Sequence, residues 1–262
     1  MAIYENFADV YDIFMQDVPY EDWTLYMQDI FNRFKLEFKS NIIVELGCGT
    51  GEMTIALKNK GYDMIGIDIS QEMLNIAKQK ALKQNLDILF LEQDMTAFEL
   101  FGTVDSVISV CDSLNYILYE YELLEVFKLV NNYLEPNGLF VFDLNTEYKF
   151  KNILGDNTFS DAQDNCAYTL ENFYDDEEQI NEFYTNFFIK YSDDNNNNNN
   201  LYQRFEEFHY EKAYSINKIK ELLSEAGLEF LAVYDELTFE PPKEESQRIF
   251  FVAREINKNK IK

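Results

Sequence analysis

A glycine-rich stretch decides the fold of this protein: residues 44–52 read VELGCGTGE, with three glycines in a GxGxG spacing. The stretch follows the apolar run NIIVEL at 41–46 and precedes MTIALKNKG at 53–61, whose apolar residues have helical spacing and which ends in glycine. Because glycine has no Cβ, its backbone can turn sharply and approach a ligand closely. The sequence therefore predicts a ligand-binding turn between a strand and a helix.

Short apolar runs alternate with amphipathic segments on both sides of this turn. One helix-like segment begins with Ser70, a suitable N-cap, and another occupies residues 215–227. Residues 135–138 read EPNG, which is typical of a turn with proline at its second position. We expect an α/β fold with a doubly wound, mostly parallel sheet and helices on both faces. The strand-like runs are residues 41–46, 64–69, 87–92, 104–110, 139–144, 229–235 and 248–254.

Two regions do not belong to this alternation. Residues 4–15 and 20–36 are rich in aromatic side chains and resemble helices, and we expect them to form a cover at the N-terminus. After residue 147 the polar–aromatic alternation has the period of strands, which predicts an inserted antiparallel sheet. The chain then divides into a cofactor-binding core, residues 1–147 and 213–262, and an inserted substrate lid, residues 148–212.

Composition limits the classes of function. The 262 residues carry a formal net charge of −26 and have a pI near 4.3, so the surface repels nucleic-acid phosphates. No segment approaches the roughly 18 to 20 apolar residues of a membrane span, and the N-terminus lacks the basic residues of a signal peptide. Three cysteines without CxxC spacing and a single histidine exclude a disulfide scaffold and a zinc centre. We expect a soluble, cytoplasmic protein without nucleic-acid or membrane partners, and we leave its oligomeric state open.

Three acids stand at the ends of the first three predicted strands. Glu45 precedes the glycines and suits a ligand whose near end is cationic. Asp68 is placed to accept hydrogen bonds from both ribose hydroxyls of a nucleoside. Asp94 can accept from an adenine amino group while the Met95 backbone N–H reaches a ring nitrogen. A dinucleotide fits less well, because its GxGxxG fingerprint needs a small residue where Glu52 stands.

Four motifs follow one another in the chain: VELGCGTGEMT, GIDIS, EQDMT and VISVCDSLNYI. In this order they resemble the successive motifs of class I S-adenosylmethionine-dependent methyltransferases, over residues 41 to 145. The N-terminal pattern YxxFAxxYD resembles a group of small, largely uncharacterised bacterial methyltransferases, related in layout to amino-sugar N-methyltransferases. The resemblance implies a Rossmann-like sheet of seven strands, S-adenosylmethionine as cofactor, and an enzyme that transfers methyl groups.

The resemblance also implies roles for single residues. The glycine turn would line the methionine part of the cofactor, and the acids after the next two strands would hold ribose and adenine. Tyr11 would close over the methionine end, Trp23 would pack over the cofactor, and Cys111 would border it as a small apolar residue. The full cofactor set is Tyr11, Trp23, Glu45, Gly47, Cys48, Gly49, Gly51, Asp68, Ile69, Asp94, Met95 and Cys111.

Two residues are candidates for catalysis. His209 lies near the end of the insertion, and histidine ionises near neutral pH, which suits a general base. Asp112 follows the fourth strand, which faces the transferred methyl group in the family. Asp112, Asp143 and Asn145 together suggest a Mg²⁺ site of hard oxygen ligands, but acids at strand ends are common in this fold and we predict no metal.

The insertion must supply the contacts to the acceptor. Residues 151–212 hold 14 acids and 4 bases among many Phe and Tyr. Aromatic walls with acids favour a neutral or cationic small molecule, although a solvated acidic face over an aromatic core is equally compatible. We expect in-line methyl transfer to an amine or hydroxyl of a small molecule. A methyltransferase of protein or peptide side chains and a non-catalytic cofactor-binding module remain alternatives. The asparagine run at 195–200 is expected at an exposed hairpin tip.

Overall fold

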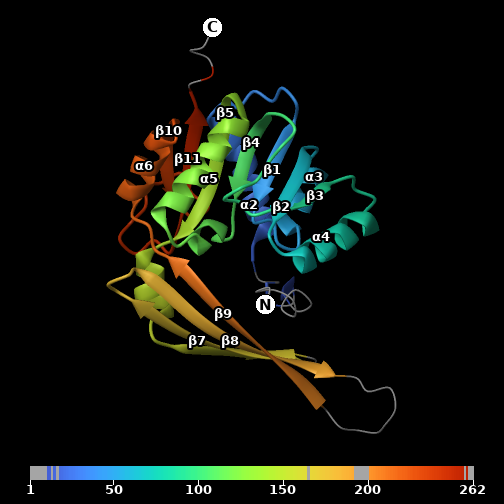
Figure 1. Ribbon diagram of the computed structural model, residues 1–262, viewed down its shortest axis with the longest axis vertical. Helices are drawn as coiled ribbons and strands as arrows, with labels where there is room; N and C mark the ends of the chain where they lie inside the picture. The colour runs from blue at the N-terminus through green and yellow to red at the C-terminus, as the bar shows by residue number, and fades with distance from the viewer. Residues whose placement is uncertain are drawn as a thin grey trace.

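The computed structural model describes residues 11, 12, 14, 15, 18–163, 166–191, 201–256 and 258. These residues form a seven-stranded sheet with helices on both faces and a separate four-stranded sheet, as Figure 1 shows. Of the predicted cover helix at 4–15, the described residues Tyr11, Asp12 and Phe14 are helical, and the remainder lies largely outside the described residues.

The seven-stranded sheet confirms the predicted fold class. Its strands are β1 (Ile42–Leu46), β2 (Asp63–Asp68), β3 (Leu89–Glu92), β4 (Val104–Ser109), β5 (Leu134–Asn145), β10 (Leu228–Asp235) and β11 (Arg248–Glu255). Their order is β10-β11-β5-β4-β1-β2-β3. β1 to β5 pair in parallel, whereas β11 is antiparallel to both of its neighbours. The carboxyl ends of β1 to β5 therefore share one edge, and β11 begins at that same edge.

Helices cover the sheet on both faces. They are α2 (Tyr20–Arg33), α3 (Glu52–Asn59), α4 (Gln71–Lys83), α5 (Glu120–Tyr133) and α6 (Ile216–Glu225). α2 and α3 bury Met27 and Met53 against one face, while α5 and α6 bury Phe127 and Leu223 against the other. Ser70 caps α4 as predicted, because its Oγ accepts a hydrogen bond from the Met73 N–H at 3.3 Å.

The predicted turn at residues 135–138 lies within β5. Asn137 has the positive φ of 69° that a tight bend favours. The pairing of β5 with β4 steps from Leu134 opposite Val104 to Leu139 opposite Ser106, so the strand bulges and then resumes its ladder. The bend exists, but strand pairing continues on both sides of it.

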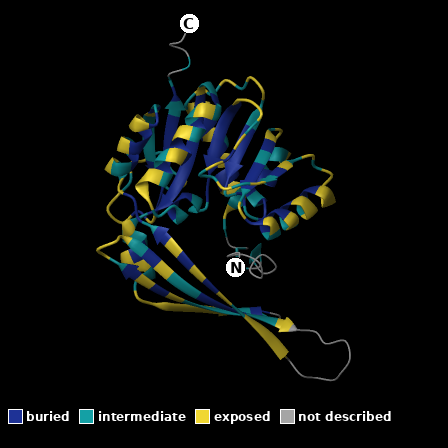
Figure 2. Cartoon of the chain, in the orientation of Figure 1, coloured by how far each residue is buried: buried dark blue, intermediate teal, exposed yellow. Residues whose placement is uncertain are grey.

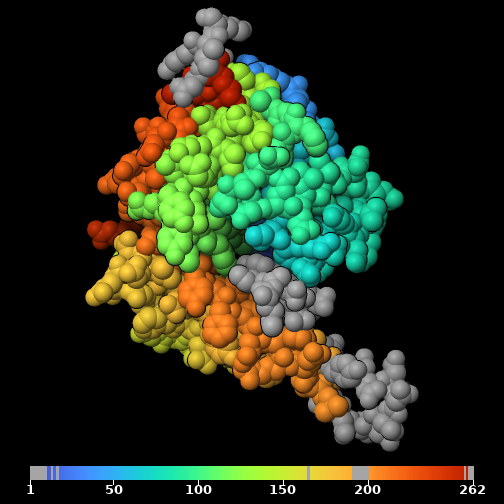
Figure 3. Space-filling view, viewed as in Figure 1, coloured from blue at the N-terminus to red at the C-terminus, as the bar shows by residue number. Residues whose placement is uncertain are grey.

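The predicted antiparallel sheet is present. We call β6 (Thr158–Ala162), β7 (Cys166–Asp175), β8 (Ile180–Tyr191) and β9 (Leu201–Lys212) the inserted sheet. It follows a short π-helical turn, η2 (Lys149–Leu154), and every neighbouring pair is antiparallel. Buried and exposed residues alternate over residues 206–211 of β9, as Figure 2 shows, and in Figure 3 the sheet projects from the body of the molecule. The asparagine run lies outside the described residues.

Long-range contacts seat the inserted sheet below the carboxyl ends of the parallel strands. The Asn115 side chain, on the short helix η1 (Ser113–Tyr116), donates to the Asn145 carbonyl at 3.2 Å and to the Lys212 carbonyl at 2.8 Å. One amide therefore joins the ends of β5 and β9. The Tyr214 hydroxyl donates to the Ile117 carbonyl at 2.6 Å, which fixes the chain just beyond the sheet.

Candidate functional site

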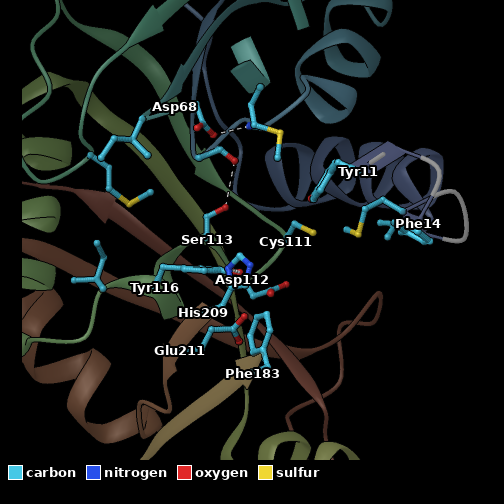
Figure 4. A pocket seen from close by; sticks show the side chains of 18 of the residues that line it. Tyr11, Phe14, Asp68, Cys111, Asp112, Ser113, Tyr116, Phe183, His209 and Glu211 are labelled. Atoms are coloured by element: carbon cyan, nitrogen blue, oxygen red, sulfur yellow. Dashed lines mark hydrogen bonds between the residues drawn. The ribbon is translucent and has the colours of Figure 1, made fainter. Parts of the chain in front are cut away.

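A cavity of about 870 Å³ lies between the two sheets. The carboxyl ends of the parallel strands, the N-terminal segment and the inward face of the inserted sheet form its walls. In Figure 4, Asp68 lies on one side of the space, and Glu211 and Phe183 lie on the opposite side. Eleven of the fourteen predicted site residues line it: Tyr11, Trp23, Gly47, Gly49, Asp68, Ile69, Asp94, Met95, Cys111, Asp112 and His209.

The glycine turn presents bare backbone to this cavity. Gly49 has a φ of 52°, and a Cβ there would meet no atom within 4 Å. Gly47 is needed for a different reason, because a Cβ at this position would lie 2.5 Å from the Ser113 Oγ. Gly47 lets the turn approach η1, whereas Gly49 leaves room for a ligand.

Asp68 is already oriented by the backbone. Its two oxygens accept hydrogen bonds from the Gly49 N–H at 2.7 Å and the Ser70 N–H at 2.8 Å. Burial raises the pKa of Asp68 above its ordinary value, although these N–H groups oppose that shift. Asp94 is exposed at the cavity and accepts from the Thr96 N–H at 2.8 Å. Both carboxylates retain acceptor capacity toward the cavity.

Three predicted cofactor residues do not line the cavity. Glu45 and Cys48 border a small space of about 40 Å³ behind the glycine turn. The Glu45 side chain is buried and accepts a hydrogen bond from Thr54, and burial raises its pKa to about 8. Gly51 lines neither space. A Cβ there would lie 2.9 Å from the Ala77 Cβ, so Gly51 serves the packing of α3 against α4.

The N-terminal segment contacts both sheets. Asp12 accepts a hydrogen bond from Thr50 at 2.6 Å and pairs with Lys80 at 2.5 Å, which fastens the segment to the core. Phe14 packs against Tyr168 of the inserted sheet with ring centroids 4.7 Å apart. Lys80 also pairs with Glu52 at 2.6 Å. The charge of Glu52 is therefore balanced by Lys80.

Arg248, at the start of β11, was not identified from the sequence. Its guanidinium donates to Asp112 at 2.6 Å and also to Asp143, on the end of β5. Burial disfavours a charged Asp112, but Arg248 outweighs this and lowers its pKa, so Asp112 is a poor base. The guanidinium occupies the place considered for Mg²⁺, and the described residues contain no group of three His, Cys, Asp or Glu suited to a metal.

Cys111 and Asp112 have positive φ angles of 61° and 55°, which are uncommon for non-glycine residues. The chain bends here as it leaves β4, and both residues line the cavity. Burial raises the pKa of the Cys111 thiol above its ordinary value, so the group stays protonated and behaves as a small apolar residue.

His209 lies on the inward face of β9 and is 4% exposed. Its Nε2 is 3.1 Å from a Glu207 oxygen, and its Nδ1 is 3.4 Å from the Tyr116 hydroxyl. The ring stacks on Phe183 with centroids 4.7 Å apart. His209 is therefore held on both of its nitrogens and on one ring face.

Glu207 and Glu211 were also missed, although a signal was present. Residues 207–211 read EFHYE, and alternate residues of a strand share a face. Both acids are buried beside His209, and Glu211 lines the cavity. The Asn145 amide donates to Glu211 at 3.4 Å while its oxygen accepts from the Lys149 ammonium at 2.9 Å.

Comparison with known proteins identifies the family. Residues 43–138 match the model of a methyltransferase domain. A Bacillus subtilis (strain 168) protein named "Putative methyltransferase YqeM" is 35% identical over 253 residues, which cover 96% of this chain and 97% of the relative. The crystal structure of an S-adenosylmethionine-dependent methyltransferase from Clostridium acetobutylicum ATCC 824 is 30% identical with a TM-score of 0.83, covering 97% of this chain and 99% of that one.

The chain belongs to the S-adenosylmethionine-dependent methyltransferases. The fold is shared more widely. The sugar N-methyltransferase KedS8 from Streptoalloteichus sp ATCC 53650 has a TM-score of 0.75 at 16% identity, with 94% of this chain and 93% of that chain covered. Within the described residues of this methyltransferase, no helix combines the length and apolar character that a membrane crossing requires.

S-adenosylmethionine is the cofactor of this methyltransferase, and the cavity fits it. Gly49 provides backbone without a side chain, and Asp68 and Asp94 provide acceptors for hydroxyl and amino groups. The Trp23 Nε1–H is buried at the cavity wall and has no hydrogen-bond acceptor among the described residues, so it offers one further donor. When bound, the cofactor supplies an activated methyl group.

Proposed function

We propose that this enzyme methylates an amine or a hydroxyl of a small molecule by in-line displacement. The observation that carries the proposal is the cavity between the two sheets, whose walls come from the core, the N-terminal segment and the inserted sheet. Its volume of about 870 Å³ lies in the range of small-molecule sites. In this proposal the insertion, residues 148–212, which contains the inserted sheet, acts as the substrate lid over the methyl end of the cofactor.

The walls opposite the glycine turn support this acceptor class. Tyr168, Phe183 and Phe187 of the inserted sheet line that side of the cavity, and Tyr116 of η1 also lines it next to His209. Aromatic walls with a few polar groups bind and orient small organic molecules. The fold is also that of KedS8, which is named a sugar N-methyltransferase.

The residues of the chain would contribute mainly by orientation and exclusion of water. Alignment of two bound reactants can supply up to roughly 7–11 kcal/mol of the barrier. His209, oriented by Glu207, is the proposed base that takes the acceptor's proton through the Tyr116 hydroxyl. Asp112, paired with Arg248, would position the bend after β4 instead of accepting a proton.

Transfer of a labelled methyl group tests the proposal. The enzyme is incubated with S-adenosylmethionine carrying the label and with separated low-mass, protein and nucleic-acid fractions of a cell extract. We expect label in the low-mass fraction, and much less of it with His209→Ala, which leaves the cofactor residues intact. Label in protein would support side-chain methylation instead, label in nucleic acid would overturn the substrate class, and no label with bound cofactor would support a non-catalytic module.

A further inference from the structure

Glu211 is a buried carboxylate that lines the acceptor side of the cavity. Its side chain is on the inward face of β9, and the residue is 3% exposed. Its Oε2 lies 3.4 Å from the Asn145 Nδ2, and no described residue donates a hydrogen bond to its Oε1. A buried carboxylate with one long hydrogen bond has unused acceptor capacity.

Two cations, Lys149 and Arg248, lie near Glu211 without forming an ion pair with it. The Lys149 ammonium donates to the Asn145 Oδ1 at 2.9 Å, which turns the amide so that its NH₂ group faces Glu211. Arg248 is paired with Asp112 and Asp143. Among the described residues, no lysine or arginine lies within ion-pair distance of Glu211. Glu211 therefore has no ion-pair partner among the described residues, and a cation bound in the cavity would supply one.

The rest of the cavity also favours a cation. Its charged lining residues are six acids and two bases: Asp68, Asp94, Asp112, Glu122, Glu211 and Glu236 against Lys149 and Arg248. Phe183 and Tyr116 line the cavity on the same side as Glu211, and aromatic faces attract cations. Figure 4 shows Phe183 beside Glu211.

We propose that Glu211 binds the positively charged amine of the methyl acceptor, and so selects amines over alcohols. This inference rests on the proposed small-molecule function and deepens it. Glu211 supplies the charge partner, whereas removal of the amine proton remains the role of His209. A charge-assisted hydrogen bond is about twice as strong as a neutral one, so the preference for an amine should be measurable.

The ionisation of Glu211 supports this role. Burial and the charge of Asp112 raise the pKa of Glu211 to about 8, while Asn145, Lys149 and Arg248 oppose the shift. The empty carboxyl therefore holds its proton to a higher pH than an ordinary glutamate does. An ammonium ion that binds to its ionised form must release a proton from Glu211, whereas an alcohol releases none.

Benzylamine and benzyl alcohol are suitable probes, because they share a ring that fits the aromatic walls and differ in charge. We expect calorimetry, with S-adenosylhomocysteine present, to give about tenfold or greater tighter binding of benzylamine, since a tenfold ratio corresponds to about 1.4 kcal/mol. Benzylamine should release protons on binding near neutral pH and benzyl alcohol should release none, measured in buffers of different ionisation enthalpy. The affinity for benzylamine should rise as the pH approaches 8.

Glu211→Gln should remove both the preference and the proton release, while leaving benzyl alcohol and S-adenosylhomocysteine affinities unchanged. The matched control is Glu206→Gln, on the exposed face of the same strand, which should keep both. A wild-type protein that binds both probes equally, or neither, contradicts the proposal, as does a Glu211→Gln variant that keeps the preference. These binding outcomes do not depend on which fraction receives the labelled methyl group. The labelling experiment tests the proposed function separately.

Discussion

The Glu207 carboxylate lies 3.1 Å from the Nε2 of His209, on the inward face of β9. This geometry favours a hydrogen on Nε2, donated to the carboxylate, and leaves Nδ1 as the acceptor on the side of Tyr116. The same strand face therefore carries the proposed base and the acid that orients it. Both residues belong to the inserted sheet, so in the proposed function this sheet supplies chemistry as well as a wall of the cavity.

His209→Ala should lower the rate of methyl transfer by about 10²–10⁴, the usual contribution of a general base. Glu207→Gln should lower it by about 10–100, because it keeps the shape of the side chain but removes a charged hydrogen-bond partner. Initial rates at saturating cofactor, with labelled methyl transferred into the low-mass fraction, measure both. A loss below tenfold in His209→Ala would return this histidine to a packing role.

Asp68→Ala should weaken binding of S-adenosylhomocysteine by about 1.5–3 kcal/mol, the range for hydrogen bonds to a charged group. Because burial raises the pKa of Asp68, affinity should also fall as the pH is lowered toward that value. Calorimetry checks both effects. The control is Asp63→Ala at the other end of β2, where the side chain is exposed. NAD bound in preference to S-adenosylhomocysteine would end this assignment.

Phe14→Ala should loosen the contact between the N-terminal segment and the inserted sheet. Each lost aromatic pair is worth about 0.5–1.5 kcal/mol, and Phe14 packs on both Tyr168 and Phe187. Hydrogen exchange should accelerate in β7 and β8, and methyl transfer should slow by about tenfold. Phe173→Ala, which removes a ring that is 53% exposed, should change neither quantity. Unchanged exchange in Phe14→Ala would mean that the segment does not hold the sheet.

Glu45 makes stability depend on pH. Burial raises its folded pKa to about 8, so the folded state holds this proton more tightly than the unfolded chain. The protonated Glu45 contributes its full share to the free energy of unfolding below the unfolded pKa of about 4.3. This share is lost as the pH rises toward 8, by at most about 1.4 kcal/mol per pH unit.

The Glu45→Gln variant lacks the titrating carboxyl. As the pH rises from 5 to 8, the free energy of unfolding of the wild type should therefore fall relative to that of Glu45→Gln. Denaturant titration of the cofactor-free protein measures this. The exposed Glu92→Gln serves as control and should follow the wild type at each pH. Equal pH dependence in wild type and Glu45→Gln would show that Glu45 is not the titrating group.

The core was predictable because its signals are local. Ser70 caps the helix that it begins, and Asp68 accepts from Gly49 and Ser70, which a strand-end acid next to a glycine turn can reach. Both relationships follow from short-range geometry and from the common edge of parallel strands. The period of alternation also predicted the inserted sheet, since strands repeat every two residues.

The acceptor side was less predictable because its contacts are distant in sequence. Arg248 meets Asp112 across 136 positions, and only the antiparallel pairing of β11 with β5 brings them together. Glu211 depends on the strand register, since a shift of one residue would turn it outward. Its meeting with Asn145 also requires that β9 end beside β5, which no local pattern indicates.

A crystal structure with bound S-adenosylhomocysteine tests the central claim most directly. We expect the ribose at Asp68, the adenine at Asp94, and the sulfur facing the space between η1 and the inserted sheet, where Tyr116 and Glu211 line the wall. A sulfur atom that faces open solvent or a flat outer surface, away from the inserted sheet, would contradict a small-molecule methyltransferase with this sheet as its lid.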